Sequence, residues 1–319
     1  MTIEQTGRAR DASAWPRILW VTGVILLATM LAHVAALVIT GGTWTGPVSL
    51  RKPVTFAETG WLVCWSLALV MPALGMRVWQ QRVVGGATAL FAVVETAIMA
   101  VQAWRGVPSH YNFTTPLDAA LMRGGAGGTA ALFLVGVGVL LVAAARARHA
   151  SAPVRLGVLA GGAVLLVGCL VGFVMIFNNS GVYQGHVGLP SRASGYLGPD
   201  AATVGPEYVL LRPETAGGDL VLPHALGVHG LVLLAVPAVL AARTGLNRRR
   251  QLAIVGTASA SVGVALAILL VHALRQLPLA ALGPLALTAL AACAAALAAS
   301  YAVIARALVF GRSAWSVVM

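Results

Sequence analysis

"ILWVTGVILLATMLAHVAALVIT", residues Ile18–Thr40, is a run of 23 residues without Asp, Glu, Lys or Arg. A secretory signal peptide has an apolar region of only about 7–15 residues. A helix that spans a bilayer needs about 20 apolar residues. Arg8, Arg10 and Arg17 precede the run. The stretch therefore predicts an uncleaved first transmembrane helix.

Seven further apolar segments of similar length follow the first. Across the chain, 59% of residues are hydrophobic and only 9% are charged, whereas about a quarter of the residues of a soluble protein are charged. The sequence therefore predicts an all-α, polytopic membrane helix bundle within residues 16–319, after an N-terminal tail of residues 1–15. The predicted spans are 16–40, 54–76, 84–104, 117–145, 154–177, 222–242, 251–273 and 279–307, with Pro284 as an alternative start of the last.

Basic residues are distributed unequally between the two sides of this bundle. With the N-terminus inside, the inner segments hold fourteen Lys and Arg residues and the outer segments hold seven. This bias, together with an even number of helices, predicts that both termini are cytoplasmic. The net charge of +12 reads as a topology signal rather than a nucleic-acid surface, because the arginines form short clusters between apolar runs. One long outer loop, about 178–221, joins helices 5 and 6.

Ionisable side chains inside spans are costly and mark functional sites by default. Glu95, Met99 and Gln102 share one face of the third helix, since their spacing is i, i+4, i+7. A carboxylate at the depth of Glu95 must be protonated, paired or hydrated. Two readings stay open: a structural hydrogen bond between helices, or a proton carrier, cation ligand or acid/base.

"VPSHYNFTTPLD", residues Val107–Asp118, is a polar stretch between two apolar spans. Its second half predicts a helix start, with Thr115 as N-cap, Pro116 at N1 and Asp118 at N3. The remaining polar residues predict the mouth of a ligand pocket above Gln102 and Glu95, and they are Arg105, Ser109, His110, Tyr111 and Asn112. We also include Glu58, although Thr55-Phe56-Ala57-Glu58 has the form of a capping box.

Histidines provide candidate ligands for haem b or a transition metal. His33 and His229 lie at similar depths on different spans, as two axial imidazoles require. His224 follows Pro223 at a helix start and is a further candidate. The alternative is that each imidazole makes one hydrogen bond between helices.

Three outer-facing stretches resemble an uncharacterised family of bacterial multi-spanning membrane proteins. They are "RKPVTFAETGW" (Arg51–Trp61), "QAWRGVPSHYNFTTPLD" (Gln102–Asp118) and "GGDLVLPHALGVH" (Gly217–His229). That family carries a Q-x-x-R-G-x-x-S-H-F-N stretch, in which Tyr111 replaces Phe here. It also carries an H-F-x-x-x-H stretch, in which Ala225 stands where an aromatic residue is expected. The resemblance implies a bacterial plasma membrane and no particular activity.

Three functional hypotheses follow. The first is an integral membrane protein that binds a small molecule, ion, metal or haem in a polar His/Glu pocket in the outer half of the bundle. The second is a proton-coupled transporter that uses Glu95, with Arg105 as an anion contact. The third is a membrane enzyme acting on a lipophilic substrate, with His110 or Glu95 as acid/base and the 178–221 loop as a lid. No P-loop or hydrolase motif is present.

Overall fold

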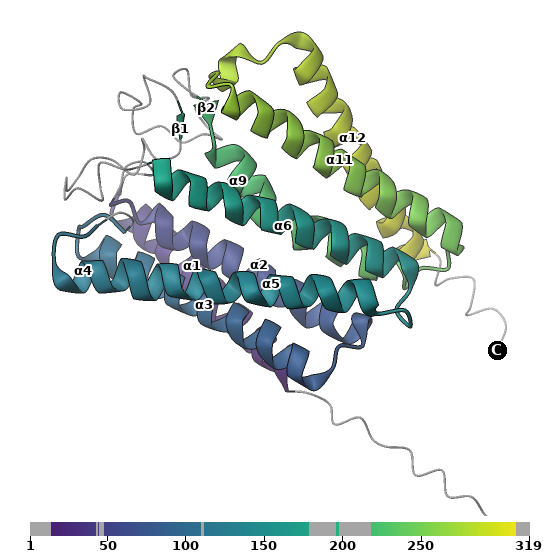
Figure 1. Ribbon diagram of the computed structural model, residues 1–319, viewed down its shortest axis with the longest axis horizontal. Coiled ribbons are helices and arrows are strands. Elements are labelled where there is room, and N and C mark those ends of the chain that lie inside the picture. The colour runs from purple at the N-terminus through teal and green to yellow at the C-terminus, as the bar shows by residue number, and fades with distance from the viewer. Residues whose placement is uncertain are drawn as a thin grey trace, which may run out of the picture.

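The computed structural model describes residues 14–42, 44, 48–109, 112–178, 196–197 and 218–310. These residues form a helix bundle with one two-stranded antiparallel pair (Figure 1). The elements are α1 (Trp15–Ile39), α2 (Arg51–Leu74), α3 (Val78–Trp104), α4 (Pro116–Ala120), the π-helix η1 (Leu121–Gly127), α5 (Gly128–Arg146), α6 (Ala152–Asn178), β1 (Tyr196–Leu197), β2 (Gly218–Asp219), α9 (Val221–Val228), the π-helix η3 (Leu231–Ala235), α10 (Val236–Ala241), α11 (Arg248–Leu274), the 3-10 turn η4 (Leu279–Ala281) and α12 (Pro284–Phe310).

Within the described residues, seven helices are long and apolar enough to cross a membrane. An eighth span forms if α9 and the continuous η3–α10 segment, which meet at a bend of 46°, are taken together. Helices suit this environment because each backbone N–H and C=O is satisfied within the segment, where no water can bind them. The predicted multi-pass membrane protein is thereby confirmed.

Several helices begin at residues other than those that the sequence predicts; α3, for example, begins at Val78 rather than at residue 84. The last span begins at Pro284, the later of its two predicted starts, because Pro suits the first position of a helix and a 3-10 turn precedes it. The start of α2 is at Arg51, with Leu50 as its N-cap. The capping-box interpretation of Glu58 is therefore wrong: Thr55 instead donates its hydroxyl to Lys52 O at 3.0 Å, inside the helix.

Glycines bring α6 into backbone contact with the bent span. A Cβ placed on Gly168 would lie 2.6 Å from the Gly227 carbonyl carbon, and one on Gly161 would lie 2.6 Å from Gly230 O. Small residues permit such approach where lipid provides no hydrophobic drive between helices. These distances show that the glycines of α6 permit its close packing on the bent span.

The two ends of the bundle differ in chemistry. The α3–α4 and α11–α12 connections, residues 105–115 and 275–283, define what we call the polar end; the turns at 75–77, 147–151 and 242–247 define the basic end. Trp15 at the start of α1 packs on Gly85 near the start of α3, and Ile304 near the end of α12 packs with Ala241 and Val255. Both ends of the described chain therefore lie at the basic end.

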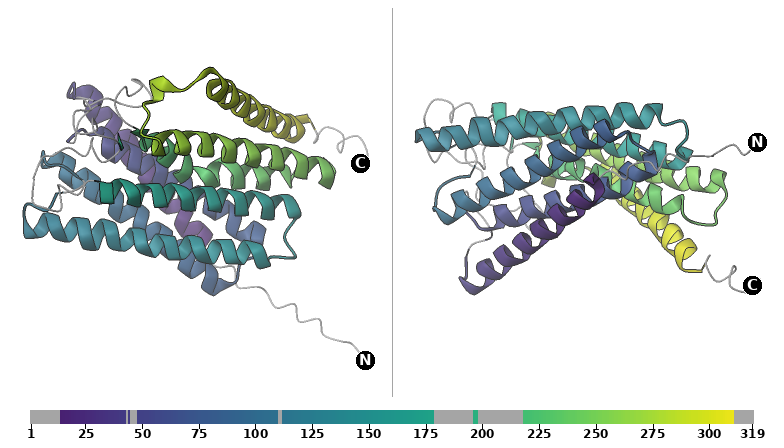
Figure 2. Two further views of the ribbon diagram at one scale, coloured as in Figure 1. Left: turned by 45° about the horizontal axis from the view of Figure 1, so that its top comes forward. Right: turned by 90° about the horizontal axis from the view of Figure 1, so that it is seen from below.

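Two helices, α1 and α12, lie at the periphery and diverge from the other helices (Figure 2). Only 22% and 11% of their most apolar windows are buried, against 50% for α2. Since apolar side chains without protein neighbours need a hydrocarbon environment, these two helices offer the bilayer its largest contact. The central core lies between α2, α3, α5 and α6, where Phe91 and Phe133 stack at a centroid distance of 4.7 Å.

Candidate functional site

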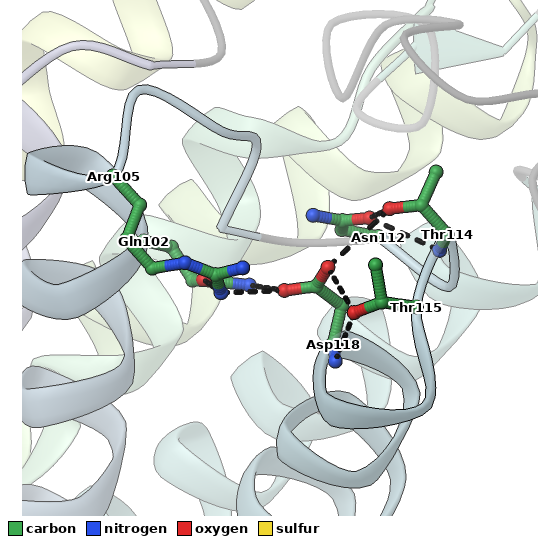
Figure 3. A network of polar contacts seen from close by, with 6 residues as sticks. All are labelled: Gln102, Arg105, Asn112, Thr114, Thr115 and Asp118. Carbon is green, nitrogen blue, oxygen red and sulfur yellow. Dashed lines mark hydrogen bonds and ion pairs between the residues drawn. The ribbon is translucent and has the colours of Figure 1, made fainter.

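A buried carboxylate joins the end of α3 to the start of α4 (Figure 3). The Asp118 side chain is 2% exposed, and its Oδ1 accepts from Arg105 Nη1 at 2.7 Å and from Gln102 Nε2 at 2.9 Å. Arg105 also donates to Gln102 Oε1. A buried charge is stable only when paired and hydrogen bonded. This network therefore holds together the two helices that enter and leave the polar end.

Thr115 caps α4 as the sequence predicts. Its hydroxyl oxygen accepts the Asp118 N–H at 3.1 Å, while the hydroxyl donates to Asp118 Oδ2 at 2.7 Å. Asn112 Oδ1 accepts both the N–H and the hydroxyl of Thr114 (Figure 3). The polar residues of this connection thus bind one another and close the turn.

Some of the residues predicted to form the mouth of a pocket instead form a hydrogen-bonded junction between α3 and α4. Gln102 and Arg105 gather around Asp118, a residue that the sequence assigned only to helix capping. Asn112 belongs to the same connection, and Ser109 is buried there at 4% exposure. His110 and Tyr111 lie outside the described residues.

Glu95 is buried on α3 without a complete set of partners. Its side chain is 5% exposed, and Oε2 has no hydrogen-bond partner among the described residues. Buried polar atoms are nearly always satisfied, and an exception calls for a functional or structural explanation. Glu95 is therefore the strongest candidate on this helix for binding a proton or a ligand.

An apolar layer separates Glu95 from the α3–α4 junction. Met99, fully buried, packs with Ile98, Met122 and Ala126. The predicted face of Glu95, Met99 and Gln102 is confirmed as buried. However, it is not a continuous polar path, because Gln102 belongs to the junction and Met99 to this layer.

A second ionisable pair links α2 to the bent span. His229 Nε2 lies 3.4 Å from Glu58 Oε2, and the two side chains are 25% and 38% exposed. These residues are 171 positions apart in the chain. Among the described residues, the histidines and carboxylates of the predicted site make no other ion-pair contact.

The hydrogen bonds of His229 constrain where its protons lie. Nδ1 is 2.7 Å from Ala225 O, and a carbonyl can only accept, so Nδ1 carries a hydrogen. The Nε2–Oε2 contact then needs one further proton, on the imidazole or on the carboxyl group. Glu58 and His229 together form a unit that shares one exchangeable proton.

Glu58 and Glu95 lie at the same depth. A Cβ on Gly60 would be 3.3 Å from Ala92 Cβ, which sets the register of the antiparallel α2 and α3. Glu58 is two residues from Gly60 and Glu95 three residues from Ala92, both towards the polar end. At about 1.5 Å per residue, their backbone depths differ by only about 1.5 Å.

The histidines predicted as metal or haem ligands have separate partners. His33 Nδ1 donates to Thr29 O at 2.8 Å and its Nε2 accepts from Trp104 Nε1 at 3.2 Å, so both ring nitrogens are engaged. His224 Nδ1 donates to Gly168 O at 2.8 Å. No group of three or more His, Cys, Asp or Glu side chains is positioned for a metal within the described part of the chain.

Tyr301 is a polar contact that the sequence prediction missed. Its hydroxyl donates to Leu233 O at 2.6 Å, within η3, the π-helical turn that follows His229. A π-turn shifts backbone hydrogen bonds out of register and is frequent at functional sites. The available signal was a lone Tyr in the Ala-rich last span.

Comparison with known proteins provides no relative from which a role could be transferred. Searches of protein-family models, of curated proteins and of solved structures each found no match. The helices of the chain themselves show that it is a multi-pass membrane protein.

Proposed function

We propose that this membrane protein binds a small polar ligand at Glu58, His229 and Glu95, in the half of the bundle nearer the polar end. The observation that carries the proposal is the Glu58–His229 pair: it joins two spans at a helix bend and stays partly exposed. Glu95 adds a second carboxyl group at the same depth. Purely structural buried pairs are normally closed to solvent and fully satisfied.

The chemistry of these groups favours a cation or a hydrogen-bond donor. The pair and Glu95 together offer carboxyl oxygens, whereas the guanidinium group of Arg105 is held by Asp118 at the junction. A metal or haem bound through both His33 and His229 receives less support, since His33 already uses both ring nitrogens. We further propose that this half faces outwards across the plasma membrane, with both termini cytoplasmic.

The test is a thermal-stability screen of the purified protein with ammonium and organic amines at constant ionic strength. We expect a compound that stabilises the wild type and has no effect on Glu58→Gln or His229→Gln. Arg82→Gln, which changes one charge at the basic end, is the matched control and should respond like the wild type. Equal stabilisation of all four proteins would contradict the proposed site.

Proton-coupled transport is the second candidate, and the broken span at His229 favours it. Discontinuous helices line the binding sites of many transporters. In liposomes that contain a pH-sensitive dye, we expect substrate- or ion-driven proton movement that Glu95→Gln abolishes. Unchanged proton movement in that variant would argue against Glu95 as the coupling group. The enzyme hypothesis stays a prediction, because His110 and most of the 178–221 loop lie outside the described residues.

A further inference from the structure

A cavity of about 400 Å³ lies at the basic end, where the α5–α6 turn meets the start of α11. In Figure 1 this turn and the start of α11 are next to each other on the right of the bundle. The volume is within the range of about 300–1,000 Å³ typical of small-ligand sites. Its lining is basic and polar, and includes Arg148, Ser151, Arg155, Arg248 and Gln251.

Among the described residues, no carboxylate compensates the positive charge of this cavity. The structure describes four acidic residues, Glu58, Glu95, Asp118 and Asp219, and none of them lines the cavity. Asp118 pairs with Arg105 at the polar end, and Asp219 accepts the N–H groups of Val221 and Leu222 at the start of α9. Three arginines thus line one space to which the described part of the chain contributes no carboxylate.

The backbone around the cavity is held in place from both sides. Arg155 donates Nη2 to Ala145 O at 3.0 Å and Nε to Ala144 O at 3.3 Å, which ties the start of α6 to the end of α5. Gln251 donates Nε2 to Leu246 O at 3.0 Å and so fixes the turn before α11. Arg148 and Arg248, by contrast, are exposed side chains, free to close on a ligand.

The directions of two helices add to the positive electrostatic potential at the cavity. The two helices α6 and α11 pack together and run in parallel, so both N-terminal ends, with their partial positive charge, lie at this cavity. Ser151, immediately before α6, supplies a hydroxyl donor. The planar guanidinium fork presents paired donors that match two oxygens of one phosphoryl group.

We propose that this cavity is a binding site for a phosphoryl anion, contacted by Arg148, Arg248 and Ser151 and framed by Arg155. Its position at the helix ends lets it receive either the phosphate of a membrane lipid or a soluble phosphate, and both offer the same oxygen acceptors. The site is independent of the Glu58–His229 pair and of any function proposed for it.

The experiment uses the full-length protein in phosphatidylcholine nanodiscs, with two arms that distinguish the sources. One arm titrates inorganic phosphate against chloride at equal ionic strength, and the other replaces part of the lipid with phosphatidic acid or phosphatidylglycerol. In both arms, binding is measured as a rise in thermal stability, and native mass spectrometry counts the lipids that the protein retains. Saturable binding of phosphate alone assigns a soluble ligand, and retention of one anionic lipid per protein assigns a headgroup. Either result supports the site.

The variant Arg148→Gln/Arg248→Gln should weaken the apparent affinity by about 10-fold or more, because charge-assisted hydrogen bonds are lost. Arg82→Gln/Arg306→Gln removes the same charge from the same end outside the cavity, and should stay within about twofold of the wild type. Arg148→Lys/Arg248→Lys keeps the charge but lacks the planar guanidinium groups, so its apparent affinity should lie between those of the two glutamine variants. No binding in either arm, or equal weakening in both glutamine variants, overturns the proposal.

Discussion

Asp118 serves two helices at once, because its N–H is capped by Thr115 while its carboxylate is held by Arg105 and Gln102 of α3. The cap could be predicted from sequence, since its partners are three residues apart and the geometry is local. The contact to Arg105 spans a connection whose path is set by packing, so it could not. Gln102 and Arg105, which the sequence predicts to line a pocket, instead stabilise the contact between α3 and α4.

Replacing Asp118 by Ala should lower the free energy of unfolding by about 2 kcal/mol. A fully buried pair would cost about 3–5 kcal/mol, but Arg105 is partly exposed and water screens it. Reversible unfolding in mixed micelles measures the change. In a double-mutant cycle with Arg105→Ala, the two effects should be non-additive. Additive effects would mean that the ion pair contributes nothing.

The bent span shows how small residues decide the shape of an element. α9 ends at Val228, His229 follows, and η3 begins two residues later at Leu231. Gly227 and Gly230 lie against Gly168 and Gly161 of α6, so backbone packs on backbone through this region. The apolar pattern alone predicts one continuous helix over 222–242, because hydropathy contains no information on the bend. The bend depends on packing against the neighbouring helices α6 and α12.

The variant Gly168→Val should destabilise the protein by about 1–3 kcal/mol or prevent its folding, because a Cβ there meets the Gly227 backbone at 2.6 Å. Gly138→Val is the matched control: it lies on α5, is exposed and has no atom within 4 Å of an added Cβ. Its stability should change by no more than about 0.5 kcal/mol. Thermal unfolding followed by tryptophan fluorescence compares the two, and equal losses would contradict the close approach.

Removing the Tyr301 hydroxyl should loosen the π-turn. Tyr301→Phe loses the bond to Leu233 O and should cost about 1 kcal/mol, with faster hydrogen exchange of the amides in η3. Ser300→Ala is the control, since the Ser300 hydroxyl binds Ala296 O within its own helix. Exchange in η3 that is the same in both variants would show that α12 does not hold the bend.

At the scale of the whole molecule, the bundle has two chemically distinct ends. Among the described residues, the carboxyl groups and most imidazole groups lie towards the polar end, and arginines without a carboxylate partner lie towards the basic end. An even number of crossings, with the bent pair counted as one span, accounts for both described chain ends lying together. The two proposed sites consequently face opposite sides of the membrane.

Cysteine labelling in intact cells tests this arrangement. Gly283→Cys lies in the α11–α12 connection and Gly245→Cys in the α10–α11 turn, both where an added side chain meets no atom within 4 Å. Cys64, Cys169 and Cys293 lie within spans and are replaced by Ala. We expect a membrane-impermeant maleimide to label Gly283→Cys only, because arginine-rich turns stay cytoplasmic. Labelling of Gly245→Cys alone would reverse the proposed orientation.

The sequence by itself determined the class of this protein, a bundle of about eight apolar helices, because span length and charge depletion follow directly from the thickness of the bilayer. It also determined the Thr115 cap and the buried face of α3, which depend on neighbours within two helical turns. Only the tertiary structure decided that Glu58 meets His229, that His33 meets Trp104, and that Arg105 binds Asp118. The physical reason is that helix adjacency and rotation arise from close packing between segments distant in the chain, which hydropathy does not encode.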